Sequence, residues 1–137
     1  MSESLTETLI RHEGIQLRPY TDTVGKLTIG VGRNLDDLGI TRDEALVLLA
    51  NDIARARSEL IRCYPWVEQL NPVRQDALVN MVFNLGLPAF SGFRKMLAAL
   101  QDRNFEQAAK EMLDSRWATQ VHGRASELAD RIERGRV

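Results

Sequence analysis

The chain has a single cysteine among its 137 residues, Cys63, so a disulfide within one molecule is excluded. A fold without disulfides suits a reducing compartment. Cys63 stands in an Arg-Cys-Tyr-Pro segment with no ligand cluster around it, and we expect it to fill a small apolar site. The two histidines, His12 and His122, are isolated, and no set of His, Cys, Asp and Glu has metal-ligand spacing. The sequence therefore predicts neither a bound metal nor a cofactor.

Long apolar runs are also missing, because no segment approaches the roughly 18 apolar residues that a membrane-spanning helix needs. The first four residues, Met-Ser-Glu-Ser, are polar and acidic, unlike the basic and then apolar pattern of a signal peptide. The 18 Lys and Arg residues nearly balance 19 Asp and Glu residues, and a net charge of −1 disfavours a dedicated nucleic-acid binder. We therefore expect no membrane insertion, no nucleic-acid partner and, since no spare apolar helix face is evident, a monomer.

Apolar residues make up 44% of the chain, and their spacing is mostly helical. The segments Ser4-Leu5-Thr6-Glu7 and Thr41-Arg42-Asp43-Glu44 both have the capping-box pattern that begins a helix. The first helix is predicted to end at Glu13-Gly14, and the second to span about five turns and stop before Pro65. Further helices are predicted from residue 72 until Gly86 and Pro88, around 93–101, around 105–113 and around 125–134.

Residues 15–34 differ from the rest because turn-forming residues dominate them. Within them Lys26–Ile29 is predicted to be a strand, with Gly30-Val31-Gly32 continuing it, in a small hairpin or three-stranded sheet. The expected fold class is therefore α+β, mostly α, in one domain over 1–137. Its expected parts are a small lobe at 14–40, a connecting helix at 41–62, and a helical lobe built from 1–13 and 63–137.

Glu13, Asp22 and Thr28 are the candidate catalytic residues. A carboxyl group in the last turn of a helix faces the negative end of the helix dipole, which disfavours ionisation and suits a proton donor. Asp22 in the turn region and Thr28 on the following strand can point into one space and hold a water molecule there. Taken singly, each has an ordinary alternative: a solvated helix-end glutamate, a turn-forming aspartate and a strand threonine.

Two glycines add to this pattern, because Gly30 and Gly32 leave one face of the predicted strand bare, where a polymer can approach the backbone. A nucleotide-binding interpretation of the glycines fails, since Leu35 stands where a third glycine belongs and no βαβ unit surrounds the run. Hydrolysis of a glycosidic bond needs a proton for the leaving oxygen and a positioned water. The three candidate residues have the chemistry for both tasks.

Segments along nearly the whole chain resemble the phage-type lysozymes, or endolysins, the family of the T-even phage lysozyme. The spacing Glu-x8-Asp-x5-Thr of the candidate residues is similar to that family's catalytic triad. The matching segments are Glu13-Gly14, Tyr20-x-Asp22-x-x-Gly25, Thr28-Ile29-Gly30-x-Gly32, Asn80-Met81-Val82-Phe83-Asn84-x-Gly86, Ser115-Arg116-Trp117 and Gly123-Arg124.

The resemblance implies a bacteriolytic enzyme that hydrolyses the β-1,4 linkage between N-acetylmuramic acid and N-acetylglucosamine in peptidoglycan. Glu13 would protonate the bridging oxygen, while Asp22, helped by Thr28, would position water on the opposite face of the sugar. The product would be inverted at the anomeric carbon, which implies a carboxyl separation of roughly 6.5–9.5 Å.

Four residues are expected to bind the substrate: three from the resemblance, and Gly30 from the bare face of the predicted strand. Phe83 and Asn84 are similar to residues that line the far wall of the cleft, with core packing or helix termination as the alternative. Gly30 would contact the polymer, and Arg124 would pair with the acidic helix end. Where the family often carries a histidine, this chain has Arg33, so the acidic partner at that position must be a different one.

Other functions stay open at this point. A lytic transglycosylase would also use an acidic residue but would not need Asp22 and Thr28, and a lysozyme-like fold can bind cell wall without catalysis. A helical DNA-binding module is disfavoured by the near-neutral charge and the glycine-rich hairpin. The enzyme is expected to stay in the host cytoplasm until a separate holin releases it, and then to act on the wall in the periplasm.

Overall fold

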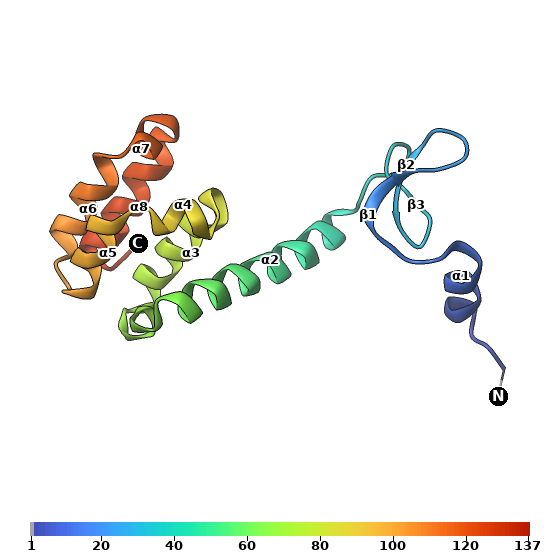
Figure 1. Ribbon diagram of the computed structural model, residues 1–137, viewed down its shortest axis with the longest axis horizontal. Coiled ribbons are helices and arrows are strands. Elements are labelled where there is room, and N and C mark those ends of the chain that lie inside the picture. The colour runs from blue at the N-terminus through green and yellow to red at the C-terminus, as the bar shows by residue number, and fades with distance from the viewer. Residues whose placement is uncertain (1) are drawn as a thin grey trace. The chain divides into compact units, whose positions relative to one another are not determined.

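The computed structural model describes residues 2–137, and their contacts group into two compact units that divide between Leu48 and Leu49. The first unit contains a short helix and a small sheet, and the second contains helices alone apart from its connecting segments (Figure 1). The division into lobes that the sequence suggests, at 14–40, 41–62, and 1–13 with 63–137, stays a prediction.

Helix α1 (Leu5–Glu13) begins and ends where the sequence predicts. Ser4 Oγ accepts the backbone N–H of Glu7 at 3.1 Å, and the Glu7 carboxylate accepts the backbone N–H of Ser4 at 3.4 Å. These two bonds complete the capping box. At the other end Gly14 has a φ of 75°, and its N–H donates to the carbonyl of Ile10 at 2.7 Å. A positive φ favours glycine, so Gly14 stops the helix directly after Glu13.

A three-stranded antiparallel sheet follows α1, with the strands in chain order (Figure 1). Tyr20 on the first strand is opposite Thr28 on the second, and Thr28 is opposite Asn34 on the third. Thr28 therefore lies on the central strand and is paired with a residue on each neighbouring strand. The strands are β1 (Gln16–Thr21), β2 (Leu27–Gly30) and β3 (Arg33–Asn34).

The sheet confirms the three-stranded alternative but corrects the extent of its central strand. Strand β2 ends at Gly30, whereas Val31 and Gly32 form the turn into β3. Both glycines have a positive φ, 71° at Gly30 and 70° at Gly32. That conformation curls the chain out of the sheet, so Gly32 does not extend a bare strand face. The first strand, β1, lies within the segment 15–34 where the hairpin or sheet was predicted, but its bounds were not predicted from the sequence.

Helix α2 (Arg42–Cys63) confirms the long helix predicted at 41–62 and contains residues of both units. Its predicted capping box is present: Thr41 Oγ1 accepts the N–H of Glu44 at 3.1 Å, and Glu44 Oε1 accepts the N–H of Thr41 at 2.9 Å. The helix ends before Pro65, which opens the short 3₁₀ helix η1 (Pro65–Gln69).

Cys63 is exposed, so its predicted role as a buried apolar filler is wrong. The buried face of α2 continues from Ala56 through Leu60 at four-residue steps, and the next step falls on Tyr64. The Tyr64 ring packs edge-on against Phe90 with 6.0 Å between the ring centroids. The aromatic ring thus fills the space at the helix end and leaves the thiol outside.

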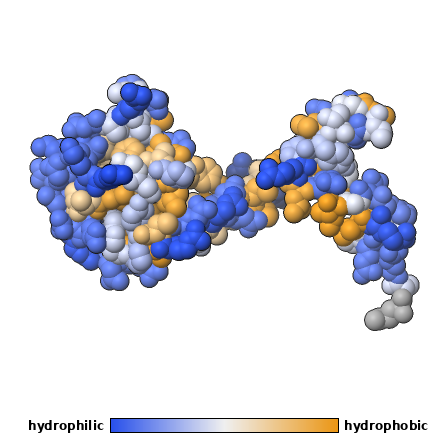
Figure 2. Space-filling model, in the orientation of Figure 1, coloured by the Kyte–Doolittle hydropathy of each residue, from blue (hydrophilic) through white to orange (hydrophobic). Residues whose placement is uncertain are grey.

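Six helices form the body of the second unit, and the last of them packs against three others, α3, α6 and α7. Side chains such as Leu78, Phe90 and Leu100 are fully buried between them. Hydrophilic residues cover much of the unit's outer surface (Figure 2). The helices are α3 (Pro72–Leu85), α4 (Leu87–Ser91), α5 (Arg94–Gln101), α6 (Phe105–Leu113), α7 (Arg116–Gln120) and α8 (His122–Arg134).

The observed elements confirm the predicted fold class: a mostly helical chain with a small N-terminal sheet and a long helix after it. Helices α4, α7 and η1 were not predicted, and α8 begins earlier than the predicted start near residue 125. None of the helices in the described part of the chain is long and apolar enough to cross a membrane. Among residues 2–137 no group of three or more His, Cys, Asp or Glu side chains is placed to hold a metal ion.

Candidate active site

Glu13 is the last residue of α1, and its side chain lies over Gly32 in the turn between β2 and β3. A Cβ atom built on Gly32 would lie 3.2 Å from Glu13 Oε2 and 3.4 Å from Glu13 Cδ. The absence of a side chain at position 32 therefore gives the Glu13 carboxyl its room. The structure brings the helix end and the glycine turn together, although they are 19 positions apart in the sequence.

Asp22 organises the turn between β1 and β2. Its Oδ1 accepts the backbone N–H of Val24 at 3.0 Å and that of Lys26 at 2.8 Å. The turn-forming role considered for Asp22 is therefore real. It engages one carboxylate oxygen, whereas Oδ2 has no hydrogen-bond partner among the described residues. One oxygen fixes the carboxylate, and the other stays available to accept a hydrogen bond.

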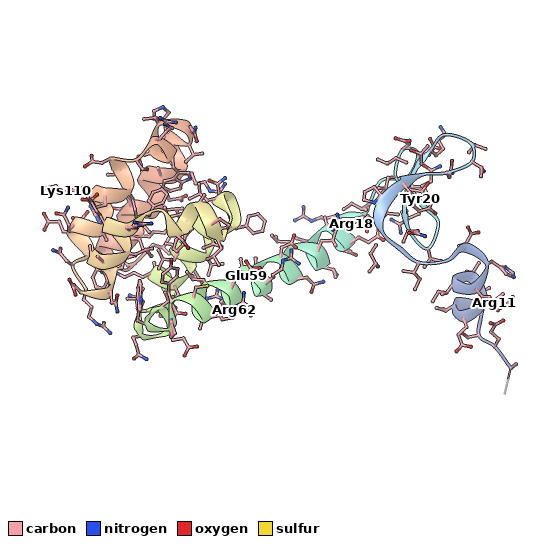
Figure 3. All side chains as sticks on the ribbon, viewed as in Figure 1. Arg11, Arg18, Tyr20, Glu59, Arg62 and Lys110 are labelled. Carbon is pink, nitrogen blue, oxygen red and sulfur yellow. The ribbon has the colours of Figure 1, made fainter. Side chains whose placement is uncertain are left out.

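Thr28 is the buried polar residue of the described chain, with 3% of its surface exposed. Its hydroxyl donates to the backbone carbonyl of Lys26 at 2.9 Å. Tyr20, labelled in Figure 3, is its neighbour across the sheet. Because the hydroxyl hydrogen is used in this bond, the lone pairs of Thr28 Oγ1 point elsewhere and can accept a hydrogen from a water.

The backbone of Lys26 joins these two side chains. Its N–H donates to Asp22 Oδ1, and its carbonyl accepts both the Asp22 N–H at 2.9 Å and the Thr28 hydroxyl. The Lys26 ammonium is directed elsewhere, to Asp37 Oδ1 at 3.1 Å. Asp22 and Thr28 are thus held on one short segment, and the cation of that segment does not neutralise the Asp22 carboxylate. The sequence predicted no role for Lys26, because a backbone N–H and carbonyl can anchor neighbouring groups whatever the side chain is.

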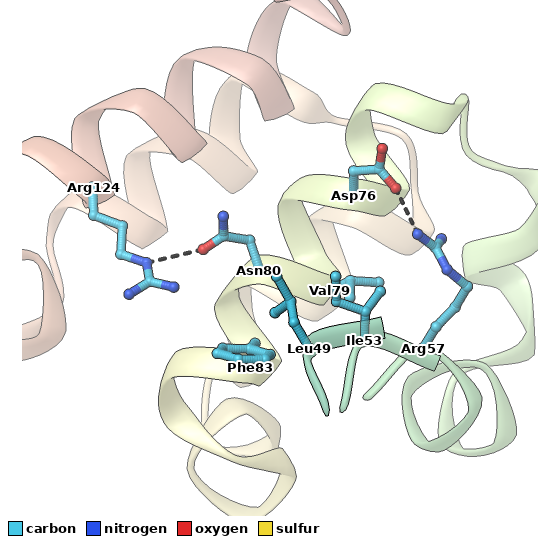
Figure 4. Close-up of a pocket in the computed structure, with 8 residues that line it drawn as sticks. All are labelled: Leu49, Ile53, Arg57, Asp76, Val79, Asn80, Phe83 and Arg124. Atoms are coloured by element: carbon cyan, nitrogen blue, oxygen red, sulfur yellow. Dashed lines mark hydrogen bonds and ion pairs between the residues drawn. The ribbon is translucent and has the colours of Figure 1, made fainter. Parts of the chain in front are cut away.

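Two of the four predicted binding residues, Phe83 and Arg124, line one groove of about 410 Å³ within the second unit (Figure 4). Arg124 Nε donates to Asn80 Oδ1 at 2.9 Å, which fixes the guanidinium against α3. Phe83 keeps 47% of its surface exposed, so it is not a core residue of this unit. At the other end of the groove Arg57 pairs with Asp76 at 2.7 Å.

Asn84 lies outside that groove and has a different partner. Its Oδ1 accepts the indole N–H of Trp117 at 2.7 Å, and Trp117 is 4% exposed. The Trp117 ring in turn meets Phe93 edge-on, with 6.1 Å between the ring centroids. The amide of Asn84 therefore satisfies a buried donor and joins α3 to α7. Its NH₂ group remains available for another acceptor.

Gly30, the fourth predicted binding residue, ends β2 with open space beside its Cα. No heavy atom lies within 4 Å of a Cβ built there. The backbone is therefore accessible at this position. A binding role for Gly30, the pairing of Arg124 with Glu13, and the separation of the two carboxyl groups all stay predictions.

A carboxyl group at a helix end, with a carboxylate and a hydroxyl anchored together on the next hairpin, has the donors and acceptors that glycoside hydrolysis requires. Comparison with known proteins agrees with this class. Residues 10–134 match the phage lysozyme family, and the chain belongs to this family of glycoside hydrolases.

Individual relatives cover the chain to different extents. It is 28% identical to the probable T4-type lysozyme 1 of Dictyostelium discoideum, over 98% of the chain and 96% of that protein. It is 34% identical to the endolysin of Salmonella phage P22, over 77% of the chain and 75% of that protein. It is also 31% identical, over 91% of its length, to the pre-baseplate central spike protein Gp5 of Enterobacteria phage T4, of which it spans only 27%.

Proposed function

We propose that the protein is a lysozyme that hydrolyses the β-1,4 linkage between N-acetylmuramic acid and N-acetylglucosamine in peptidoglycan, with inversion at the anomeric carbon. The observation that carries this proposal is the shared anchorage of Asp22 and Thr28 on Lys26. Family membership supports the substrate class, and the names of the D. discoideum and P22 relatives agree with it.

Glu13 is the proton donor of the proposed mechanism. The glycosidic oxygen leaves as an alcohol only if a proton reaches it as the bond breaks, and a carboxylic acid is a suitable donor. Glu13 is exposed at its helix end and therefore accessible to a polymer. Its carboxyl has the room beside Gly32 to face an approaching sugar.

Asp22 is the base of the proposed mechanism, and it acts through a water. A water that donates one hydrogen to Asp22 Oδ2 and the other to Thr28 Oγ1 has a lone pair free for the anomeric carbon. As that oxygen attacks, its proton passes to Asp22 while Glu13 protonates the leaving oxygen. Attack opposite the departing group inverts the configuration, as in other hydrolases that use a water between two carboxyl groups.

The decisive variant is Glu13→Gln, which keeps the shape of the side chain and removes its acidic proton. We expect it to lower the rate of lysis of outer-membrane-permeabilised Gram-negative cells by about 10²–10⁴-fold, measured by turbidity. The matched control is Glu7→Gln in the same helix, since glutamine also completes a capping box. If the Glu13→Gln variant lysed cells at the wild-type rate, a residue other than Glu13 would be the proton donor.

Product analysis distinguishes the alternative reactions. Hydrolysis leaves a reducing N-acetylmuramic acid end, whereas a lytic transglycosylase leaves an anhydro-muramic end. NMR of the first product formed separates inversion from retention. Anhydro ends would replace the proposed reaction with the transglycosylase, and binding to cell wall without any new ends would indicate a non-catalytic wall-binding protein.

The release of the enzyme is part of the same proposal. The P22 relative is named an endolysin, which supports a role in host lysis. We propose that the protein works as a monomer and reaches the periplasmic wall through a separate pore-forming holin. Expression in host cells with and without a pore tests this route. Lysis without a pore would contradict release through a holin. A stable dimer measured by light scattering would contradict the proposed monomer.

A further inference from the structure

The Glu13 carboxyl has one close neighbour, Gly32, in the turn between β2 and β3. The side chain leaves the end of an exposed helix, and no hydrogen bond to it occurs among the described residues. Its Oε2, Cδ and Cγ atoms would lie 3.2, 3.4 and 3.5 Å from a Cβ atom on Gly32. Three consecutive atoms of Glu13 thus lie along the bare side of this glycine.

Two properties of position 32 are independent of each other. Its φ of 70° is a conformation that L side chains adopt only with strain. Separately, a Cβ atom at this position would be in tight contact with Glu13, whose Oε2 would lie 3.2 Å away. Five other glycines with positive φ, at positions 14, 25, 30, 39 and 86, have no atom within 3.4 Å of a built Cβ. Only the second property distinguishes Gly32 from these five glycines.

We propose that Gly32 is a positioning residue for the proton donor: the missing side chain at position 32 sets where the Glu13 carboxyl lies. This inference rests on the proposed function, in which Glu13 acts as the acid. A methyl group at position 32 displaces the flexible carboxyl by a few tenths of an ångström and leaves the sheet paired. The acid then stands away from the oxygen that it must protonate.

The test is Gly32→Ala, with Gly39→Ala as its matched control. Gly39 lies in the same unit with a φ of 61°, so alanine there incurs the same kind of backbone strain, but nothing lies within 4 Å of its Cβ. A misplacement near 1 Å costs about 10²-fold in rate, so a displacement of a few tenths of an ångström should cost about 5–10-fold. We expect Gly32→Ala to lower kcat about 5–10-fold with little change in KM, and Gly39→Ala to keep both near wild type.

A double-mutant cycle separates positioning from a purely structural effect. The shorter side chain of Glu13→Asp withdraws the carboxyl from position 32, so a methyl group there no longer displaces it. Gly32→Ala should therefore lower kcat about 5–10-fold beside Glu13 and leave it nearly unchanged in the Glu13→Asp background. Equal losses in the two backgrounds would overturn the proposal. The loss of kcat would then come from backbone strain at position 32 and not from a displaced carboxyl.

The crystal structure of the Gly32→Ala variant tests the same claim without any activity. A displaced Glu13 carboxyl over an unchanged sheet supports the proposal, and a carboxyl in its original place overturns it. Failure of the proposed function has a different outcome: the wild-type protein releases no reducing ends, while the variant structure still reports on the displacement.

Discussion

Arg33 and Glu44 form a two-point ion pair that joins strand β3 to the first turn of helix α2. Arg33 Nη1 lies 2.8 Å from Glu44 Oε1, and Nη2 lies 2.6 Å from Oε2. Arg33 also donates to the carbonyl of Gly39, and Glu44 closes the capping box with Thr41. Glu44 is therefore the acidic partner of Arg33, which the sequence alone left unidentified. An arginine suits it because its planar guanidinium engages both oxygens of one carboxylate.

This ion pair predicts a pH-dependent stability. The Arg33 guanidinium, followed by the Thr41 N–H, lowers the pKa of Glu44 from 4.5 to about 2. A carboxylate with a lowered pKa stabilises the fold fully above its unfolded value, and this contribution is lost as the pH falls through the folded value. Glu44→Gln should therefore be less stable than wild type from about pH 7 to pH 5, and the difference should shrink as the pH falls and vanish only below about pH 2.

Urea unfolding at a series of pH values measures this difference. Asp43→Asn is the control, because it removes a carboxylate from the same first turn of α2 without breaking the pair with Arg33. The ion pair would have no role in stability if Glu44→Gln unfolded like Asp43→Asn at neutral pH.

The sequence predicted the long helices well because their signals are local. Both capping boxes, at Ser4 and at Thr41, form as the sequence indicates. A capping box needs only a side chain and a backbone N–H three residues away, so tertiary structure has little to add. The same holds for Gly14 and Gly86, whose positive φ values end α1 and α3.

Elements that depend on distant partners were missed or were predicted without bounds. Strand β1 carries Pro19 and an irregular register near Gln16, and it is a strand because β2 pairs with it. Helix α7 has only five residues and is held by the bond from Trp117 to Asn84, 33 positions away. A sequence pattern does not reveal such a partner. For the same reason the sequence offered only core packing or helix termination as alternatives to a substrate role for Asn84, and not a bond to Trp117.

Asp22 has a structural and a proposed catalytic role, and two substitutions separate them. In Asp22→Asn the amide oxygen can still accept the N–H groups of Val24 and Lys26, so the unfolding free energy should stay within about 0.5 kcal/mol of wild type. The base is lost, and kcat should fall about 10²–10⁴-fold. Asp22→Ala should lose the same activity and about 1 kcal/mol of stability as well.

Urea unfolding and turbidity on the two Asp22 variants give the comparison. A fully active Asp22→Asn would leave only the turn-forming role for this residue. If Asp22→Ala lost activity and Asp22→Asn did not, the conclusion would be the same.

Thr28 allows a matched pair of substitutions. Thr28→Val keeps the shape and loses the hydroxyl, while Lys26 O still accepts the N–H of Asp22. Thr28→Ser keeps the hydroxyl and loses a buried methyl group. Each should cost about 1 kcal/mol of stability. If the hydroxyl helps to hold the water, Thr28→Val should lower kcat about 10-fold, the value of one hydrogen bond, while Thr28→Ser stays near wild type. Equal activities would remove Thr28 from the mechanism.

Arg74 on α3 holds the end of α8, so we expect a substitution of Arg74 to destabilise the helical unit. Its Nε donates to the carbonyl of Ile132 at 2.6 Å, and its Nη2 donates to that of Glu133 at 2.8 Å. The guanidinium also stacks on Phe105, with its Cζ 3.5 Å from the ring centroid. The last carbonyls of a helix have no donor within the helix, so a charged group from α3 takes that place.

Arg74→Met should therefore lower the unfolding free energy by about 2–4 kcal/mol, because it removes two charge-assisted hydrogen bonds and a cation–π contact together. Arg94→Met is the control, since Arg94 is exposed at the start of α5 and its side chain has no bonded partner among the described residues. Urea unfolding gives the difference, and amide exchange in α8 locates it. Because a helix end without its donors frays, exchange should increase first near Ile132, and unchanged exchange there would mean that α8 is held by apolar packing alone.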